Sequence, residues 1–327
     1  MGLRFPEDLR DEDAAHLSLL EGIPVRPVFI MGLHRSGTTW LYESLASVCR
    51  LAPVTLHHVF CYPRLLARAA EGRGLEDQVL IDRYFEEHGL STRGIDAIGL
   101  SHATVEEYGW ILQRWSGALT VTQRTRARFE ELCRKLQFLR PDAPAVLLKN
   151  PWDTGGAPAI HAMFPDAPFV FIARDPLRIV QSQFQNSLIF GGTEAHFLHL
   201  LLQGFPLGRF VIGCQRLLYR LVGERLYARL ILRFIQRDVL KELRRYRDAY
   251  AALPPERKLE LTYTELATDP QGTLTRAAEF LGFPLDERAL AEVTPRPRAG
   301  PLHPAVERIA DGFRARVAAA GLARGDV

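Results

Sequence analysis

The chain has 327 residues, of which 47% are hydrophobic and 24% are charged. These fractions are typical of a folded globular protein, and they exclude a disordered chain, a collagen-like chain and a bundle of membrane spans. The formal net charge of +3 is too small to indicate a nucleic-acid-binding protein, whereas a cleft for a small polyanion fits it. Because no internal repeat or low-complexity linker interrupts the chain, we predict a single domain over 1–327.

The four cysteines indicate a reducing compartment. They lie far apart and have neither the spacing of zinc ligands nor that of a disulfide framework. Residues 1–16 are charged and lack the apolar core of a secretory signal, and no run of about 18 uncharged apolar residues could cross a membrane. We therefore expect a cytoplasmic protein, and its motifs offer no evident metal site.

Apolar residues alternate between strand-like and helix-like patterns from residue 27 onward. The first apolar run ends in glycine and is followed by a helical repeat, which is the opening unit of a doubly wound α/β fold. We therefore predict a parallel sheet of P-loop type with helices on both faces. The predicted strands are 27–32, 143–151, 167–176 and 257–266, and the predicted helical segments are 40–52, most of 60–140, 186–252 and 270–282. The tail from Thr294 carries four prolines and is predicted to be irregular.

A phosphate-binding loop is predicted directly after the first strand. Two glycines with the spacing G-x-x-x-x-G allow backbone N–H groups to turn inward around phosphate oxygens, and the next helix adds its positive N-terminal end. Arginine and threonine side chains within the loop add further donors. A tight turn that binds nothing is the alternative. The candidate binding residues are Gly32, His34, Arg35, Ser36, Gly37, Thr38, Thr39 and Trp40.

One position in this loop departs from the pattern of nucleotide kinases. That pattern requires Lys after the second glycine to reach the β- and γ-phosphates, and this chain has Thr38 there. The loop is therefore suited to holding phosphates, with less support for γ-phosphoryl transfer. A P-loop nucleotide or small-molecule kinase is the alternative function, and a non-catalytic nucleotide- or anion-binding protein is a third hypothesis.

A second anion site is predicted after the third strand. The strand ends at Arg174, Asp175 and Pro176 then turn the chain, and Ser182 lies about two helical turns further on. A helix that folds back from Pro176 would bring Arg174 and Ser182 around one phosphate. The alternative is an ordinary surface turn in which Arg174 pairs with Asp175.

Four motifs in this order resemble the sulfotransferases that use 3′-phosphoadenosine 5′-phosphosulfate (PAPS), in particular their bacterial branch. FIMGLHRSGTTWL resembles the 5′-phosphosulfate loop, of the G-x-x-R-S-G-T-T type, and FVFIARDPLRIVQS resembles the 3′-phosphate motif with Arg174 and Ser182. LLKNPWDTGGAPAIHAMFPDAP and LTYTELATDPQGTLTRAAEFLGFP resemble two further segments of that branch. The resemblance implies a doubly wound α/β fold, PAPS as donor, 3′-phosphoadenosine 5′-phosphate (PAP) as product, and no metal. It also implies a donor-binding core over 26–187, a helical acceptor-side insertion over about 188–256, and a C-terminal strand, helix and loop over 257–327.

The chain departs from the family pattern at His34, which stands where Pro is common. Arg35 stands where cytosolic members have Lys, as it does in the other branches. Pro151 occupies the position of the acceptor-activating His of those members, so the base must come from elsewhere.

The resemblance also implies which residues carry the chemistry. Arg35 would hold the 5′-phosphate and stabilise the leaving group, and Lys149 is the best second cation for the sulfuryl group. Arg178, Arg296 and Arg298 are the next candidates for that role. The predicted bases are His57 or His58, with Glu106 or Glu107 as a second pair of which at most one should face the site; each pair has an ordinary structural role as its alternative.

An unusual helix is predicted over 209–237, where arginines recur between aliphatic and aromatic residues. It is either a core helix with a solvated basic edge or an interfacial helix that docks on anionic lipid and admits an apolar acceptor. The predicted acceptor is a hydroxyl or amine of a small molecule, lipid or glycan, with possible peripheral membrane contact through 209–237 and no nucleic acid. The oligomeric state stays open.

Overall fold

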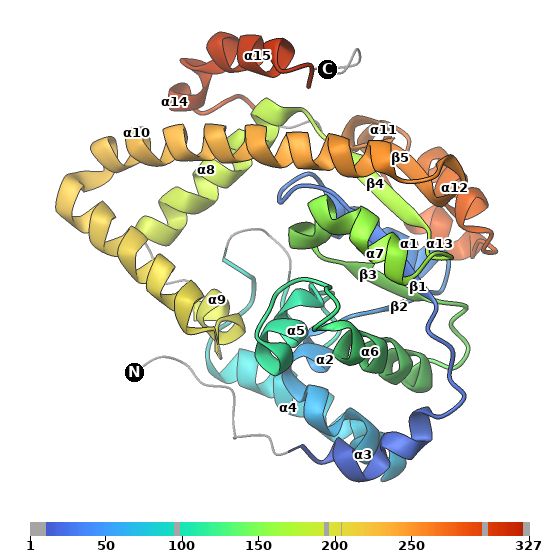
Figure 1. Cartoon of the computed structure of the whole chain (residues 1–327). Helices are drawn as coiled ribbons and strands as arrows, with labels where there is room; N and C mark the ends of the chain where they lie inside the picture. The colour runs from blue at the N-terminus through green and yellow to red at the C-terminus, as the bar shows by residue number, and fades with distance from the viewer. Residues whose placement is uncertain (1–10, 95–98, 193–195, 204, 296–299, 323–327) are drawn as a thin grey trace.

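A five-stranded parallel sheet forms the centre of the molecule (Figure 1). The computed structural model describes residues 11–94, 99–192, 196–203, 205–295 and 300–322. The strand order is β2-β3-β1-β4-β5, so the chain leaves the central strand on one side and later continues on the other. Ligands of doubly wound sheets bind at such a switch point, beyond the carboxyl ends of the strands. The strands are β1 (Pro27–Met31), β2 (Ala52–Pro53), β3 (Val146–Lys149), β4 (Phe169–Ala173) and β5 (Lys258–Thr262).

Alternate side chains of the strands enter two separate cores. Val28 and Ile30 of β1 pack on one face, whereas Phe29 and Met31 pack on the other. Phe29 stacks on Phe169 at 5.1 Å between ring centroids. The predicted doubly wound α/β fold is confirmed, and the short edge strand β2 was not predicted because its two residues leave no periodic pattern.

Helices cover both faces of the sheet. The smaller core is closed by α1 (Thr38–Val48), α11 (Tyr263–Thr268), α12 (Pro270–Leu281) and α13 (Glu287–Glu292). The larger core takes in the segment between β2 and β3, where helices were predicted. This segment contains α2 (Leu56–Cys61), η2 (Tyr62–Arg64), α3 (Leu65–Ala70), α4 (Gly74–Glu87), α5 (Gly109–Ser116) and α6 (Arg126–Leu139). The 3₁₀ helices η1 (Asp13–Leu20), η3 (Pro151–Gly156) and η4 (Pro255–Arg257) and the helix α7 (Ala157–Met163) complete the connections.

Three helices lie between β4 and β5, and we call this segment the insertion: α8 (Pro176–Gly192), α9 (His196–Leu201) and α10 (Pro206–Ala252). It begins before the predicted insertion over about 188–256, because α8 already starts at Pro176. Gly223 breaks α10 with φ 74° and ψ 162°, a combination open to glycine, and divides it into arms over 206–222 and 224–252. Figure 1 shows the two arms meeting in a bend that projects from the sheet. Among the described residues, no helix is both long and apolar enough to cross a bilayer.

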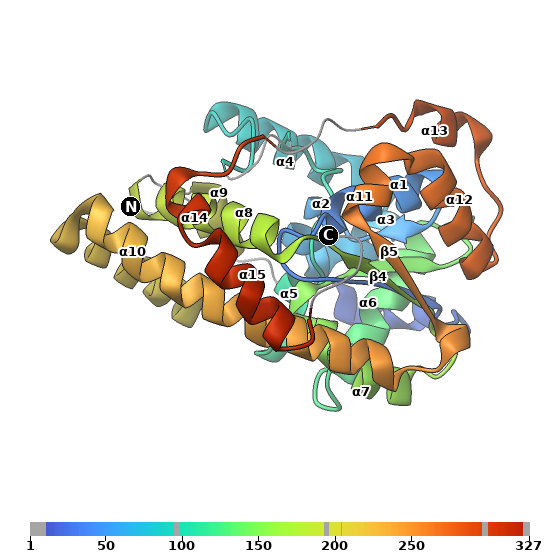
Figure 2. The same cartoon turned by 90° about the horizontal axis from the view of Figure 1, so that it is seen from above.

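The predicted irregular tail is correct for its first described part and wrong for the rest, because residues 294–295 and 300–303 lie outside helices and strands but helices follow them. The tail forms α14 (Pro304–Glu307) and α15 (Ala310–Ala319), and α15 lies over α8 and α10 in Figure 2. Pro304 occupies the first turn of its helix, where a missing N–H costs nothing. Phe313 and Val317 are one turn apart and are buried in the larger core, which outweighs the breaking tendency of the prolines.

A buried carboxylate holds the segment that follows β3. Asp153 accepts hydrogen bonds from Tyr108 Oη at 2.6 Å, from Asn150 Nδ2 at 2.9 Å and from the N–H of Val121 at 3.1 Å. Burial raises the pKa of Asp153 to about 6, against the effect of these donors. Thr154, the next residue, contacts the loop after β1.

Replacing this carboxylate should destabilise the protein. Asp153→Ala leaves three buried donors without their acceptor, and we expect the free energy of unfolding to fall by about 2–4 kcal/mol in urea titrations. Asp166→Ala is the control, because its 94% exposed carboxylate pairs with Arg257 at the surface and its loss should cost less than about 1 kcal/mol. Equal stability of the two variants would contradict the structural role of Asp153.

Candidate active site

The loop between β1 and α1 has the conformation of an anion-binding nest. Arg35 has φ 72° and Gly37 has φ 100°, on either side of Ser36, and such alternation turns successive N–H groups toward one point. A Cβ atom on Gly32 would lie 2.7 Å from Ser36 Oγ, and one on Gly37 would lie 2.5 Å from Tyr263 Cδ2. Both glycines are therefore required by close packing. The Ser36 hydroxyl is buried and has no hydrogen-bond partner among the described residues.

Thr154 fixes the start of this loop. Its hydroxyl accepts a hydrogen bond from the N–H of Gly32 at 3.0 Å and donates one to the carbonyl of Gly32 at 2.9 Å. Asp153, the residue before Thr154, is itself fixed by its hydrogen bond with Tyr108. The loop is therefore held in place by a buried segment with several hydrogen bonds.

The two predicted anion sites meet at Arg35. Arg174, at the end of β4, donates a hydrogen bond to the backbone carbonyl of Arg35 at 2.8 Å, and Arg35 Nε donates to Ser182 Oγ at 2.9 Å. Burial lowers the pKa of Arg174, and the positive charges of Arg35 and Arg178 add to this effect. The structure thus brings two guanidinium groups and a serine hydroxyl together, an arrangement that favours a bound anion.

Arg174 and Asp175, whose pairing was the alternative prediction, have other partners in the structure. Asp175 Oδ1 accepts a hydrogen bond from the N–H of Leu177 at 2.8 Å, in the first turn of α8. The guanidinium of Arg174 lies over the ring of Tyr263, 4.1 Å from its centroid. A cavity of about 450 Å³ borders Ser36 and Arg174, within the size range of small-molecule sites.

Lys149 lies beside the loop, buried to 1% exposure. Its ammonium donates a hydrogen bond to Thr39 Oγ1 at 3.0 Å and lies 3.3 Å from Glu107 Oε1. Lys149 was alternatively predicted to be a strand-end lysine that reaches solvent, but its side chain is buried. Burial is tolerated because a carboxylate and a hydroxyl compensate the charge.

The acidic pair Glu106 and Glu107 is divided between two environments. The expectation that only one of them faces the loop fits the structure, but they precede α5 and do not belong to a helix. Glu106 lies 3.5 Å from Arg93, and burial raises its pKa. Glu107, in contrast, pairs with Lys149.

The charges of Glu107 and Lys149 both act on His34 in the loop. Burial lowers its pKa, the carboxylate of Glu107 opposes this effect, and Lys149 adds to it. Its ring contacts the edge of Trp152 at 4.7 Å between centroids, and Trp152 in turn contacts Trp110 at 5.2 Å. His34, Trp152 and Trp110 thus form an aromatic wall, which is linked to Lys149 and Glu107 through the electrostatic effect of these two charges on His34.

His57 and His58 lie on α2, and among the described residues no contact of their side chains reaches the loop. His58 Nδ1 accepts a hydrogen bond from the N–H of Thr55 at 2.9 Å, in a capping box at the start of the helix. Burial lowers the pKa of His57 to about 4, and it lowers that of His58 well below 6.5. Both rings are therefore neutral at pH 7, with structural contacts of their own.

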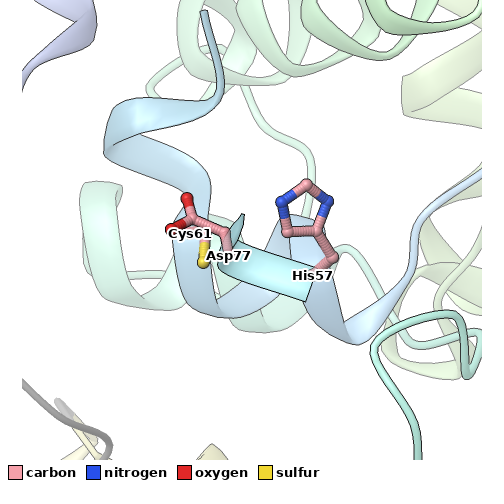
Figure 3. Close-up of side chains that lie close together, drawn as sticks. All are labelled: His57, Cys61 and Asp77. Carbon is pink, nitrogen blue, oxygen red and sulfur yellow. The ribbon is translucent and has the colours of Figure 1, made fainter. Parts of the chain in front are cut away.

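Figure 3 shows His57 close to Cys61 of α2 and Asp77 of α4. Their ligand atoms lie within 4.8 Å of one another, so they form a possible metal-binding group. However, Arg64 lies 2.8 Å from Asp77 Oδ1, and both side chains are only 5% exposed. A buried guanidinium thus already compensates the carboxylate, which favours an ion pair at this place over a metal ion.

Sequence reasoning missed Tyr263 and Trp152 as parts of the site. Tyr263 packs against Gly37, carries Arg174 on its face and meets Trp40 at 6.1 Å between centroids. It stands in the T-Y-T-E-L motif, which could have identified it. Arg178 donates a hydrogen bond to the carbonyl of Gly300 at 2.6 Å, whereas Arg296 and Arg298 lie outside the described residues.

Comparison with known proteins agrees with this geometry. The model of the sulfotransferase family matches residues 27–203, more than half of the chain, and the chain therefore belongs to this family. Among curated proteins it is similar to the omega-hydroxy-beta-dihydromenaquinone-9 sulfotransferase Stf3 of Mycobacterium bovis (strain ATCC BAA-935 / AF2122/97) and of Mycobacterium tuberculosis (strain CDC 1551 / Oshkosh). Each is 26% identical over 278 residues, and the match covers 79% of this chain and 63% of the relative. The chain thus spans less than two thirds of the length of these relatives.

Two solved structures share the fold. Sulfotransferase STF1 from Mycobacterium tuberculosis H37Rv matches with a TM-score of 0.57 and 20% identity, over 93% of this chain and 81% of that one. Sulfotransferase STF9 from Mycobacterium avium matches with a TM-score of 0.54 and 18% identity, over 94% and 79%. The predicted resemblance to sulfotransferases is confirmed.

A methyl group on Gly37 should strongly weaken anion binding by the loop. Gly37→Ala adds a clash with Tyr263 to an unfavourable φ, and we expect PAP affinity in calorimetry to fall more than about tenfold. The control is Gly89→Ala, which has φ +63° and nothing within 4 Å of the added atom. It should lower the melting temperature through backbone strain but leave PAP affinity unchanged. Normal PAP binding by a folded Gly37→Ala variant would remove the loop from the binding site.

Proposed function

We propose that this protein is a PAPS-dependent sulfotransferase that releases PAP. The observation that carries the proposal is the hydrogen bond from Arg174 to the carbonyl of Arg35, which joins two anion sites from separate motifs. A donor with a 5′-phosphosulfate and a 3′-phosphate requires two such adjacent sites. Membership of the sulfotransferase family and Thr38 in place of the kinase lysine both favour sulfuryl transfer over the kinase alternative.

In the proposed reaction, the loop amides, Arg35, Ser36 and Thr38 hold the 5′-phosphate, while Arg174 and Ser182 hold the 3′-phosphate. The acceptor oxygen forms a bond to sulfur as the bond from sulfur to the bridging phosphate oxygen breaks, and PAP leaves with the electron pair. Negative charge grows on the bridging and sulfuryl oxygens, so fixed cations and N–H donors provide most of the catalysis. The reaction as proposed needs no metal.

Lys149 and Glu107 are the proposed transfer pair. Lys149 lies between Thr39 and Glu107 and would stabilise the sulfuryl oxygens. Glu107 would take up the proton that the hydroxyl group of the sulfuryl acceptor loses. Glu107 is preferred among the four predicted bases because it alone has a described contact with Lys149. The other three, namely His57, His58 and Glu106, have buried structural contacts elsewhere.

We further propose an apolar acceptor that carries a hydroxyl group. The name of the curated relative Stf3 refers to a hydroxylated menaquinone derivative, and the aromatic wall of His34, Trp152 and Trp110 suits an apolar molecule. The proposed setting is cytoplasmic and peripheral to a membrane, with contact through residues 209–237.

The assignment of Arg174 to the 3′-phosphate can be tested with PAP and AMP, two ligands that differ by this phosphate group alone. Arg174→Ala should weaken PAP binding about 10- to 100-fold, since a charge-assisted hydrogen bond is worth roughly 1.5–3 kcal/mol. Binding of AMP, which lacks the 3′-phosphate, should change far less. Calorimetric titration of both ligands measures the difference, and an equal loss for both would assign Arg174 to another role.

The transfer pair is tested by comparing two neighbouring glutamates. Glu107→Gln should lower kcat for labelled PAPS by at least about 100-fold with a hydroxylated isoprenoid acceptor, because the base is lost. Glu106→Gln is the matched control and should keep kcat within a few-fold. Lys149→Ala should also lower kcat while the PAP dissociation constant changes little. A fully active Glu107→Gln variant would exclude Glu107 as the base.

A further inference from the structure

A basic groove lies far along the insertion, between α8, the second arm of α10 and α14. It has a volume of about 580 Å³. Its floor is apolar and includes Leu188, Leu232 and Ile309, and its charged side chains come from α10 and the end of α14. None of the residues assigned to donor binding or transfer lines it.

Four arginines border this groove. Arg225, Arg229 and Arg233 recur every four residues along one side of α10, and Arg308 faces them from the end of α14. All four are exposed, and none of their side chains has an ion pair or hydrogen bond in the described part of the chain. The one acidic side chain of the groove, Glu224, accepts a hydrogen bond from Tyr219 Oη at 3.3 Å. The groove therefore has an excess of positive charge without an internal partner.

The charge of the whole protein is concentrated in the same region. Residues 206–234 contain six arginines and one glutamate, a net charge of +5, against +3 for the whole chain, which leaves −2 for the remainder. Such a local excess is costly through self-repulsion unless an anionic partner or solvent compensates it. A second copy of this chain would bring two such surfaces together, so like-charge repulsion disfavours it as the occupant.

An apolar stripe runs beside the arginines. Leu226, Leu230 and Phe234 each follow an arginine by one position, and their exposures are 46%, 42% and 62%. The first arm adds Leu207, Phe210, Leu217 and Leu221, which are 57–74% exposed. Figure 1 shows that both arms meet in the projecting bend. Basic and apolar stripes on one projecting element are the pattern of a helix that lies in a membrane interface.

We infer that the groove between α10 and α14 binds the phosphate groups of anionic phospholipids while the bend of α10 enters the bilayer interface. The inference extends the proposed membrane contact by assigning a headgroup site and its ligand chemistry. Arg225, Arg229, Arg233 and Arg308 form the phosphate site, and Leu226, Leu230 and Phe234 enter the acyl boundary. Guanidinium groups suit this role because they bind phosphate oxygens in pairs.

Vesicle sedimentation of the full chain tests this inference. The protein should sediment with vesicles of phosphatidylcholine containing about 30% phosphatidylglycerol, and far less with pure phosphatidylcholine. The triple variant Arg225→Glu, Arg229→Glu, Arg233→Glu should lower the partition coefficient by at least about tenfold, because each basic residue near an anionic surface contributes separately. Phe234→Ser should weaken binding without changing its dependence on the anionic lipid.

A second triple variant with the same charge change is the control. Arg124→Glu, Arg244→Glu, Arg288→Glu alters three exposed arginines outside the groove and should keep most of the binding. Equal loss in both triple variants would overturn the inference in favour of net charge alone. Sedimentation that is equal with neutral and anionic vesicles would overturn it as well. If calorimetry shows that the groove binds inorganic phosphate but the protein does not bind vesicles, the inferred lipid ligand is wrong and the groove binds a soluble phosphate compound instead.

PAP titration of the same variants separates this inference from the proposed function. The groove variant should bind PAP as the unaltered protein does, because the groove and the loop share no residues. Failure of the unaltered protein to bind PAP would refute the proposed function and leave the vesicle result unaffected.

Discussion

The structure of this protein depends on placing two arginines next to each other at the carboxyl end of a parallel sheet. Arg35 and Arg174 come from loops after β1 and β4, which are neighbouring strands on either side of the topological switch. Burial of Arg174 lowers its pKa, and the positive charge of Arg35 adds to this effect. The face of Tyr263 and the carbonyl of Arg35 offset part of the cost of burying this charge, and a bound polyanion would offset the rest.

Rigidity around this charge pair comes from buried polar groups with several partners each. Asp153 with Tyr108 and Asn150 holds η3, and Thr154 extends that support to Gly32. The same strand end places Lys149 against Thr39 and Glu107. The loop therefore does not need to reorganise when charge develops on a ligand, and preorganised donors of this kind are the main source of electrostatic catalysis.

The insertion follows a different physical principle. The second arm of α10 buries Tyr227, Leu232, Ile235 and Val239 and packs against α8. Its exposed residues include Arg225, Arg229 and Arg233, whose side chains have no partner among the described residues, and the aliphatic residues Leu226 and Leu230. Gly223 divides α10 into two arms that meet in a bend, and both arms carry exposed apolar side chains. The loop after β1 is thus held by buried polar contacts, whereas the insertion has charged and apolar side chains exposed at its surface.

Local sequence patterns determined the elements and the phosphate loop. Val28, Phe29 and Ile30 are buried whichever face they point to, so a continuous apolar run predicts a parallel strand. Gly32 and Gly37 have the spacing that a phosphate loop needs, and close packing explains both. The helical character of 186–252 was equally predictable, because its apolar residues recur with helical period. The tail was not, because its prolines suggested a break while Phe313 and Val317 gain their stability from a distant core.

Tertiary structure alone decided which polar side chains share a site. Glu106 and Glu107 are equivalent in sequence. They follow Val105, which forms an isolated β-bridge with Thr55, and the side chain of Glu106 pairs with Arg93 whereas that of Glu107 pairs with Lys149. His57 and His58 have suitable ring chemistry, yet α2 packs them against Thr55, Cys61 and Asp77. The direction of a side chain depends on the packing of elements far apart in the chain. The sequence by itself therefore determined what chemistry was available, and the fold decided where it could act.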